Sequence, residues 1–112
     1  MCGKVIEKVM KALTEKDYET LASCFSENCV YFDYCPSMNG NPNSYIYGSA
    51  CVSMYFRRMF VTGELEVAEP MIESENSASY FGAYSGPYVY ARLSIEERDS
   101  SNRIKRAVAH PA

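Results

Sequence analysis

The sequence lacks the residue patterns from which zinc sites and disulfide frameworks are built. It has no Trp, a single His and five cysteines, and none of the cysteines forms a Cys-x-x-Cys pair. One histidine is too few for a usual zinc site, and an odd set of cysteines favours reduced thiols. We therefore expect a cytoplasmic protein with no metal and no organic cofactor.

The sequence also lacks an excess of positive charge and any long apolar run. Eleven Lys and Arg oppose fourteen Asp and Glu, and the densest basic cluster is 103–106, close to the end. Nucleic-acid binding depends on neutralising phosphates, so this balance argues against it. No apolar run approaches the length of a membrane span, and residues 1–4 lead directly into a helical pattern rather than a signal peptide. We expect neither a nucleic-acid partner nor a membrane.

The length and composition are typical of one globular domain, which we expect over 1–112. The chain has 112 residues, of which 47% are hydrophobic and 22% are charged. A chain of this length buries enough surface for a core without metal or disulfide support. Its ten tyrosines suit partly solvent-exposed positions such as pocket walls, interfaces and half-buried strands.

Apolar residues with helical spacing occur in three stretches. One covers 5–13, and a second begins at the N-cap residue Asp17. A third helix is expected to start at a Ser49 cap and to end near Gly63. The apolar positions are Val5, Ile6, Val9, Met10 and Leu13, then Tyr18, Leu21, Ala22 and Phe25, then Val52, Tyr55, Phe56, Met59 and Phe60.

A period of two replaces the helical period elsewhere. A short strand is expected over 29–33, and four strands follow Glu64, separated by turns at 74–76, 85–87 and 99–102. Pro70 marks an edge or a bulge in the first of these four. Residues 36–48, rich in Pro, Asn, Gly and Ser, are expected to form an irregular loop that is either a binding loop or lid, or mobile.

The order of these elements predicts an α+β fold. Helices come first, with one strand among them, and the final strands are joined by short turns, which favours an antiparallel sheet. Such a sheet has one face for the helices to cover. A curved sheet wrapped around three helices leaves a concave space between the layers, which is a natural position for a pocket.

Asp33 is the first candidate for a working group. It is one of three aspartates, and the only one with an aromatic residue on each side, Phe32 and Tyr34. These flanks are expected to bury the carboxyl group, and burial raises its pKa to a range that suits a base near neutral pH. The alternative is a strand-end carboxylate that binds the backbone of the following loop.

Three stretches resemble the nuclear transport factor 2-like superfamily, which includes ketosteroid isomerases and SnoaL-like polyketide cyclases. They are 14–25 (TEKDYETLASCF) for the second helix, 27–33 (ENCVYFD) for the next strand, and 99–104 (DSSNRI) for the turn into the last strand. With the element order, the likeness covers nearly the whole chain. It implies a cystatin-like cone with a pocket at its open end and a homodimer formed through the outer face of the sheet.

The resemblance places Asp33 where ketosteroid isomerases keep their proton-shuttling aspartate. That chemistry removes a proton next to a carbonyl group and returns it elsewhere. The oxyanion donors of those enzymes are missing, because the first-helix position corresponds to Val9 and the late-strand position falls within 91–94, which has no carboxyl group. Such donors contribute several kcal/mol, so ketosteroid isomerase activity itself is not expected.

Five further residues are candidate ligand-binding groups. Tyr18, Tyr31 and Tyr55 carry hydroxyls that suit a ligand carbonyl, although each also fits a core or wall position. Arg92 suits a carboxylate clamp or an exposed pair with a glutamate. His110 titrates in the useful range and faces either the pocket or the dimer interface. By strand alternation, its face also carries Ile104, Arg106 and Val108.

We therefore expect a protein that binds a small hydrophobic or carbonyl-containing ligand. The leading interpretation is an isomerase, cyclase or dehydratase-like enzyme that uses Asp33 as its acid or base. The alternative is a non-catalytic ligand-binding or dimerisation module of the same fold, because a fold does not decide activity.

Overall fold

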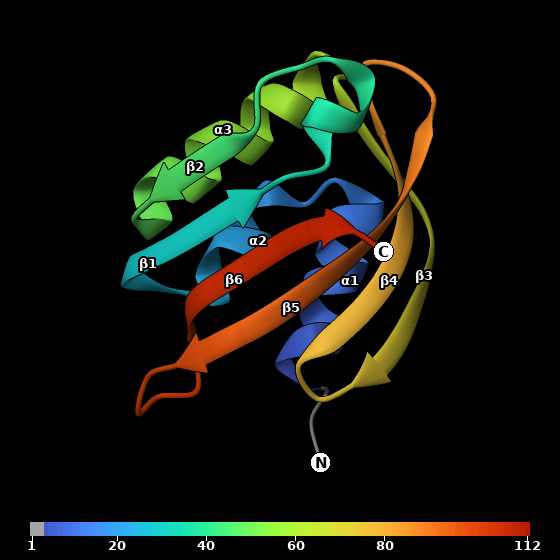
Figure 1. Ribbon diagram of the computed structural model, residues 1–112. Helices are drawn as coiled ribbons and strands as arrows, with labels where there is room; N and C mark the ends of the chain where they lie inside the picture. Colours follow the sequence, from blue (N-terminus) through green and yellow to red (C-terminus); the bar gives the residue numbers. More distant parts are fainter. Residues whose placement is uncertain (1–3) are drawn as a thin grey trace.

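The computed structural model describes residues 4–112, so Cys2 lies outside the described residues. Residues 4–112 form three α-helices and six strands, one strand more than predicted, in the predicted α+β class (Figure 1). The helices are α1 (Val5–Glu15), α2 (Tyr18–Ser23) and α3 (Ser49–Val61). The strands are β1 (Phe25–Asp33), β2 (Ser44–Tyr47), β3 (Leu65–Ser74), β4 (Ser77–Tyr84), β5 (Tyr88–Arg98) and β6 (Ile104–Pro111).

Helices α1 and α2 are joined by a tight link. Lys16 ends α1 in the left-handed conformation, with φ of 60°. The Asp17 carboxylate then accepts a hydrogen bond of 3.1 Å from the Thr20 N–H, so the predicted N-cap is confirmed. Helix α2 is shorter than predicted, because Phe25 pairs with Ile104 and begins β1 instead of continuing the helix.

Helix α3 has the predicted apolar face but a different start. Val52, Phe56 and Phe60 are buried. Ser49 is not the cap, because it is already the first helical residue and Gly48 precedes it with φ of 89°. At Gly48 the N–H donates to the Cys29 carbonyl over 2.8 Å, so strand β1 sets the position at which the helix begins.

The strands form one sheet in the order β2-β1-β6-β5-β4-β3. Strands β3 to β6 are antiparallel neighbours, as predicted. Strand β1, however, pairs parallel with β6, so the sheet is mixed and the prediction of a wholly antiparallel sheet was wrong. No hairpin joins β1 to β6, and without one a sequence pattern does not set the direction of a pair.

Residues 36–48 are more regular than the irregular loop that was predicted. Pro36–Asn39 form a short 3-10 helix, and β2 then pairs antiparallel with β1, Ile46 lying opposite Tyr31. Gly40, with φ of 77°, ends the 3-10 helix and lets the chain reverse. The Tyr-Ile-Tyr sequence has strand propensity that the surrounding turn residues obscured. We call residues 36–43 the strap.

Strand β3 lies at the edge of the sheet and is irregular where Pro70 predicts it. The register shifts between Ala68 and Met71, and Glu69 in between has φ of 51°. Because Pro cannot donate to a ladder, this bulge sits at the edge where no further strand is needed. The three predicted turns between β3, β4, β5 and β6 are confirmed by the strand limits.

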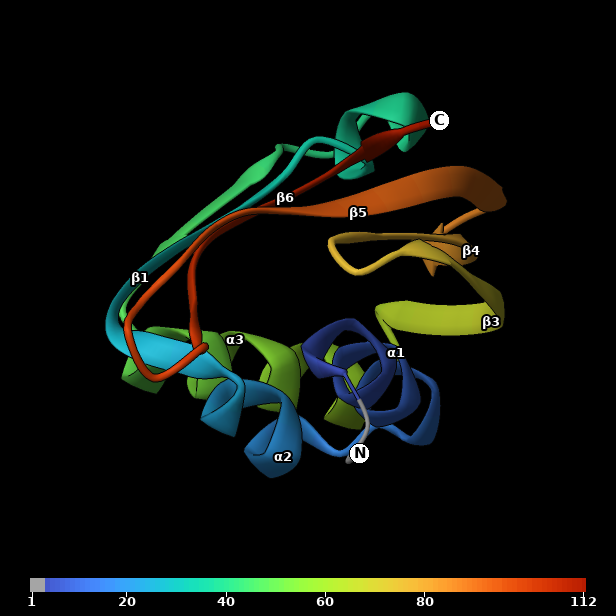
Figure 2. The ribbon, with the colours of Figure 1, turned by 90° about the horizontal axis from the view of Figure 1, so that it is seen from below.

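The sheet curves around the helices, which lie together on its concave side (Figure 2). Inward-facing residues of β5, such as Ala91 and Leu93, are buried against them. The outer face stays open and carries several exposed aromatic residues, among them Tyr45, Tyr47, Phe81, Tyr88 and Tyr90. Among the described residues, no helix is long and apolar enough to cross a membrane.

Candidate functional site

Asp33 is the last residue of β1 and is fully buried. It pairs with Ala109 across the parallel ladder, and both side chains point to the concave side. The aromatic flanks predicted to bury it are not responsible. Phe32 points outward, where it packs against Tyr45 with ring centroids 5.3 Å apart and lies beneath the Arg106 guanidinium. Burial of Asp33 therefore does not come from Phe32, which lies on the opposite face of the sheet.

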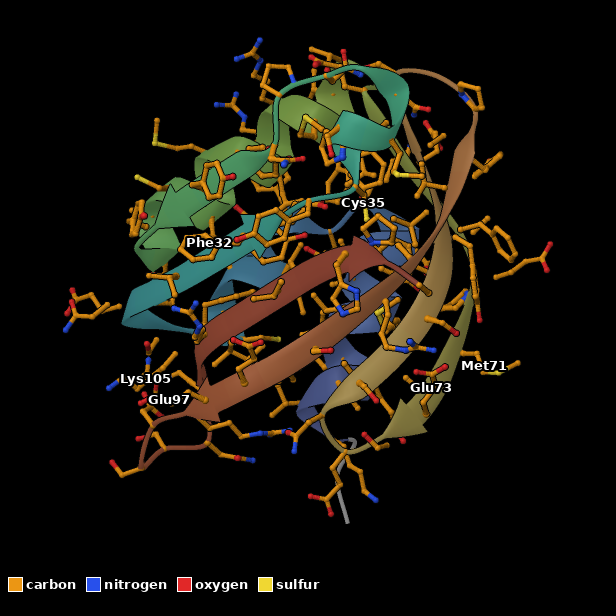
Figure 3. The ribbon with its side chains drawn as sticks, in the orientation of Figure 1. Phe32, Cys35, Met71, Glu73, Glu97 and Lys105 are labelled. Carbon is orange, nitrogen blue, oxygen red and sulfur yellow. The ribbon has the colours of Figure 1, made fainter. Side chains whose placement is uncertain are left out.

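The carboxylate of Asp33 accepts hydrogen bonds from two residues close to it in the sequence. The Tyr31 hydroxyl donates to Oδ2 over 3.3 Å, and the Cys35 N–H donates to Oδ1 over 2.9 Å. The second bond is the backbone turn that was the alternative role for this residue. Figure 3 places Cys35 at the junction between the end of β1 and the strap. Asp33 therefore accepts one hydrogen bond from the backbone, which holds the turn, and one from the Tyr31 hydroxyl.

Tyr31, Tyr80 and Tyr84 form a buried tyrosine cluster around Asp33. The hydroxyls of Tyr80 and Tyr84 lie 2.9 Å apart and share a hydrogen bond. Gly82 stands between these two residues on β4, and a Cβ there would lie 2.7 Å from the Tyr84 ring. The missing side chain of Gly82 is therefore what allows both rings to lie side by side above the strand.

The cluster sets the protonation states of its members. Burial raises the pKa of Asp33 from 3.8 to about 6, although hydrogen bonds from Cys35, Tyr84 and Tyr31 oppose the rise. Burial also raises the pKa of the three cluster tyrosines well above its usual value, and the nearby Asp33 charge raises it further. Near neutral pH the tyrosines are therefore protonated donors, while Asp33 can take up or release a proton.

A pocket of about 340 Å³ opens next to this cluster, between the strap and the C-terminal half of α3. Tyr55 and Tyr84 contribute to its wall, and the Asp33 charge acts on the pKa of both hydroxyls. Burial raises the pKa of Tyr55 to about 12. Its hydroxyl is 2.9 Å from the Ser44 hydroxyl. Further polar groups in the wall are Asn41, Asn43, Arg58 and Glu64.

The strap is fastened across the end of the sheet by two asparagine side chains. The Asn41 amide donates to the Tyr84 carbonyl over 3.1 Å. The Asn39 amide donates to the Pro87 carbonyl over 3.1 Å and reaches the Tyr84 carbonyl at 3.5 Å. These contacts join the strap to the β4–β5 turn. A ligand reaches Asp33 only after the strap or the tyrosines move, because the carboxyl group has no exposed surface.

The expected gaps in a ketosteroid isomerase site are present. Val9 is buried on α1, and the inward-facing residues of the late strand are Ala91 and Leu93. Neither position supplies an oxyanion donor. The hydroxyls next to Asp33 instead come from β1 and β4, through Tyr31 and the Tyr80–Tyr84 pair.

Two of the predicted ligand-binding residues lie away from Asp33. Arg92 and His110 are register partners on the outer face of β5 and β6. Arg92 makes a bidentate pair with Glu73 at 2.7 and 3.1 Å, so its exposed-pair alternative is the one observed. Figure 3 shows Glu73 on β3, at the opposite edge of the sheet from Phe32. The pocket assignment of Arg92 and His110 is therefore corrected.

The predicted face of His110 is also partly wrong. Arg106 and Val108 share its outer face, but Ile104 is fully buried on the inner side. The register between β5 and β6 shifts near Arg106, and this irregularity reverses the alternation.

The three predicted tyrosines occupy different places. Tyr31 contacts Asp33, and Tyr55 lines the neighbouring pocket. Tyr18 packs against the core from α2. Tyr80 and Tyr84 were not among the predicted site residues, although their spacing with Gly82 on a predicted strand places all three on one face. Within residues 4–112, no three His, Cys, Asp or Glu side chains gather into a group that could hold a metal ion.

Comparison with known proteins extends these observations. No family model and no curated protein matches the sequence. Solved structures do match. A SnoaL-like protein of Burkholderia thailandensis is 16% identical, with a TM-score of 0.63 over 95% of this chain and 89% of that one. An NTF2-like protein of Cytophaga hutchinsonii is 14% identical, with a TM-score of 0.65 over 96% and 87%.

A third match has a described reaction. SalBIII, an epoxide hydrolase/cyclase-like enzyme in pyran ring formation in the polyether salinomycin, is 15% identical, with a TM-score of 0.62 over 96% of this chain and 88% of that chain. Other matches are described as having a cystatin-like fold. The chain therefore has the SnoaL-like, NTF2-like fold that its sequence motifs predicted. At these identities the likeness concerns the fold alone.

Proposed function

We propose that the protein binds a small carbonyl-containing molecule and acts on it as an isomerase, cyclase or dehydratase-like enzyme, with Asp33 as the acid or base. The observation that carries the proposal is a fully buried carboxyl group with a pKa of about 6, bonded to a tyrosine hydroxyl beside a pocket. Groups with pKa values near the working pH are the most effective proton carriers. The cyclase-like neighbour adds support at the level of the fold.

The proposed chemistry uses one base and one hydroxyl donor. Ionised Asp33 removes a proton from a carbon next to the ligand carbonyl, and the electron pair moves onto the carbonyl oxygen. A neutral tyrosine hydroxyl of the buried cluster then donates to that oxygen. In a β,γ-unsaturated ketone the electron pair then returns from the oxygen, the double bond moves into conjugation with the carbonyl group, and Asp33 gives the proton back at the γ carbon, so the isomerisation needs no other reactant. The raised tyrosine pKa values support this role, because these hydroxyls keep their protons.

The pocket size favours a small substrate. Its volume of about 340 Å³ lies at the lower limit of the usual range for ligand pockets, roughly 300–1,000 Å³. We therefore expect single-ring or short-chain ketones to bind better than polycyclic compounds. Tyr55 and Ser44 are the polar groups that we assign to ligand binding in the pocket wall. Thermal-shift screening of both ligand groups tests the preference, because a bound ligand raises the melting temperature.

The decisive experiment separates catalysis from binding. Any ketone that raises the melting temperature is incubated with the protein in D₂O, and deuterium entry next to its carbonyl is followed by NMR. We expect catalysed exchange in the wild type, and exchange at the uncatalysed rate in Asp33→Asn with binding retained. Tyr18→Phe is the matched control, since Tyr18 packs against the core from α2. Equal exchange in the wild type and in D33N would refute the role of Asp33.

A specific observation also favours the alternative, a non-catalytic ligand-binding module. The Cys35 N–H bond to Asp33 is a structural use of the carboxylate that needs no reaction. Under that alternative, ligands stabilise the wild type and D33N alike, and deuterium enters at the uncatalysed rate in both. The same experiment thus decides between the two functions.

We further propose a cytoplasmic homodimer that forms through the outer face of the sheet. The exposed aromatic side chains of that face support it, among them Phe81 and Tyr90, whose ring centroids lie 5.0 Å apart. Solution mass at micromolar concentration should be twice the chain mass, and Tyr90→Glu should halve it. Met54→Glu, which changes an exposed residue of α3, should leave the dimer intact. A wild-type monomer would contradict the proposal.

A further inference from the structure

A second concave site lies at the end of the sheet opposite the strap. Its volume is about 570 Å³, larger than that of the pocket beside Asp33. Three segments form it: the first turns of α1, the end of α2, and the turn between β5 and β6. Figure 3 labels Lys105 and Glu97 at this end of the sheet, far from Cys35. The lining residues are Val5, Glu7, Lys8, Lys11, Ser23, Cys24, Ser101, Asn102 and Arg103. We call this site the lysine groove.

The charge of the lysine groove is opposite to that of the chain. Lys8, Lys11 and Arg103 face one carboxylate, Glu7, whereas the whole protein has a net charge of −3. Arg103 is 3.6 Å from Asp99 and is partly neutralised. Lys8 and Lys11 form no ion pair with any carboxylate of residues 4–112. In that part of the chain six of the other cations do. Two ammonium groups are thus left to bind an anion.

A fixed amide group stands opposite the lysines. Asn102 is in the left-handed conformation with φ of 66°, and its side-chain oxygen accepts a hydrogen bond of 3.1 Å from Arg98. Because that bond occupies the amide oxygen, the two N–H donors of the Asn102 side chain remain available to a ligand. The groove therefore combines exposed cations with one oriented hydrogen-bond donor.

The floor of the groove is apolar. Val5 is half-buried against the core, and Cys24 is buried. Burial raises the pKa of the Cys24 thiol, and the positive charge of Lys8, which lines the same groove, opposes that rise. Lysine stems add further apolar surface beneath their charged ends. The site therefore has an apolar base with cationic groups at its rim.

From this arrangement we infer that the lysine groove binds a small organic anion. Its carboxylate, phosphate or sulfonate group would lie between Lys8, Lys11 and the Asn102 amide, and its apolar part would lie against Val5 and Cys24. This ligand is separate from the carbonyl compound proposed for the Asp33 pocket. The inference uses none of the residues of that pocket and does not depend on it.

The test uses 8-anilinonaphthalene-1-sulfonate, an aromatic anion that fluoresces when it is bound in an apolar site. We expect Lys8→Ala and Lys11→Ala each to weaken binding, and the double variant to weaken it by about tenfold, equivalent to ~1.4 kcal/mol. In an NMR titration, the Asn102 side-chain amide signals of the full chain should shift. Binding should weaken as salt is added.

Lys4→Ala is the matched control, because Lys4 is an exposed lysine of the same helix end that does not line the groove. It should bind the probe as the wild type does. Equal weakening in K4A and K8A would show a general charge effect and overturn the inference, as would unchanged binding in K8A/K11A. D33N must keep its affinity for the probe; a parallel loss there would move the binding to the Asp33 pocket and also overturn it.

Discussion

The two ends of the curved sheet differ in the burial and charge of their polar side chains. At the strap end, a carboxyl group and three tyrosines are buried together, and amide groups fasten a segment of chain across them. At the other end, exposed lysines surround an open groove. Buried hydrogen bonds act in a low dielectric and are costly to break, whereas exposed charges are screened by water and salt. The strap end should therefore respond to pH and to mutation, and the lysine end mainly to salt.

The largest expected effect concerns the pH dependence at the strap end. The native pKa of Asp33 is about 6 and its ordinary value is 3.8, so the folded state keeps a proton that the unfolded state has lost. The free energy of unfolding should thus fall by about 3 kcal/mol as the pH rises from about 4 to about 6 and be constant above, as far as Asp33 is concerned.

D33N removes this contribution and isolates it from the other carboxylates. Asp17, whose pKa is lowered chiefly by its bond from Thr20, has the opposite pH dependence and is present in both proteins. Urea unfolding of the wild type and D33N across this pH range measures the difference. If the two curves stay parallel, Asp33 does not titrate as proposed and the contrast between the two ends loses its main support.

The next effect tests the packing of the tyrosine cluster. Gly82→Ala places a Cβ where the Tyr84 and Tyr80 rings lie, so we expect a loss of about 2 kcal/mol in the free energy of unfolding. The same substitution in a Tyr84→Leu background should cost much less, because the closest ring is gone. Chemical denaturation of the wild type, G82A, Y84L and G82A/Y84L measures this difference as a double-mutant cycle. An additive result would show that the rings do not depend on Gly82.

A third effect tests the strap itself. Asn39→Ala with Asn41→Ala removes the bonds to the β4–β5 turn, each worth about 1 kcal/mol, so the strap should open at least about tenfold more often. Cys35 lies under the strap and is fully buried, so its rate of labelling by a thiol reagent reports the opening. Mass spectrometry of the peptides measures that rate.

Cys29 supplies the control within the same experiment, since it is buried on β1 away from the strap. Its labelling rate should stay unchanged in the double variant. If Cys29 and Cys35 accelerate together, the variant has lost global stability and the strap is not an independent lid.

The smallest effect is expected at the lysine end. Replacing Lys8 and Lys11 by Met removes two exposed charges without ion-pair partners in residues 4–112, so the free energy of unfolding should change by less than about 0.5 kcal/mol. Urea unfolding at low and high salt measures it. A loss of about 2 kcal/mol or more would mean that these lysines support the fold and that the two ends differ less than their structures indicate.

The candidate site shows which features of Asp33 its neighbours in the sequence predict and which they do not. Asp33 was chosen for its flanking Phe32 and Tyr34, yet Phe32 packs on the outer face, and the carboxyl group is buried by Tyr31, Tyr80 and Tyr84. Adjacent residues of a strand point to opposite faces, so sequence neighbours cannot bury the same side chain. Asp33 is buried, as its flanking residues predicted, but Phe32 takes no part in burying it.

The order of the three α-helices and of the strands other than β2, the apolar faces of the helices, the alternation of β5 and the α+β class were determined by the sequence alone, because each depends on a period or a turn within a few residues. Tertiary structure decided the parallel pairing of β1 with β6, the outward position of Arg92 and His110, and the strap held by Asn39 and Asn41. These features depend on contacts between distant segments and on a register shift near Arg106, which no local period records. The same long-range contacts place Asp33 among hydroxyls and give it its raised pKa.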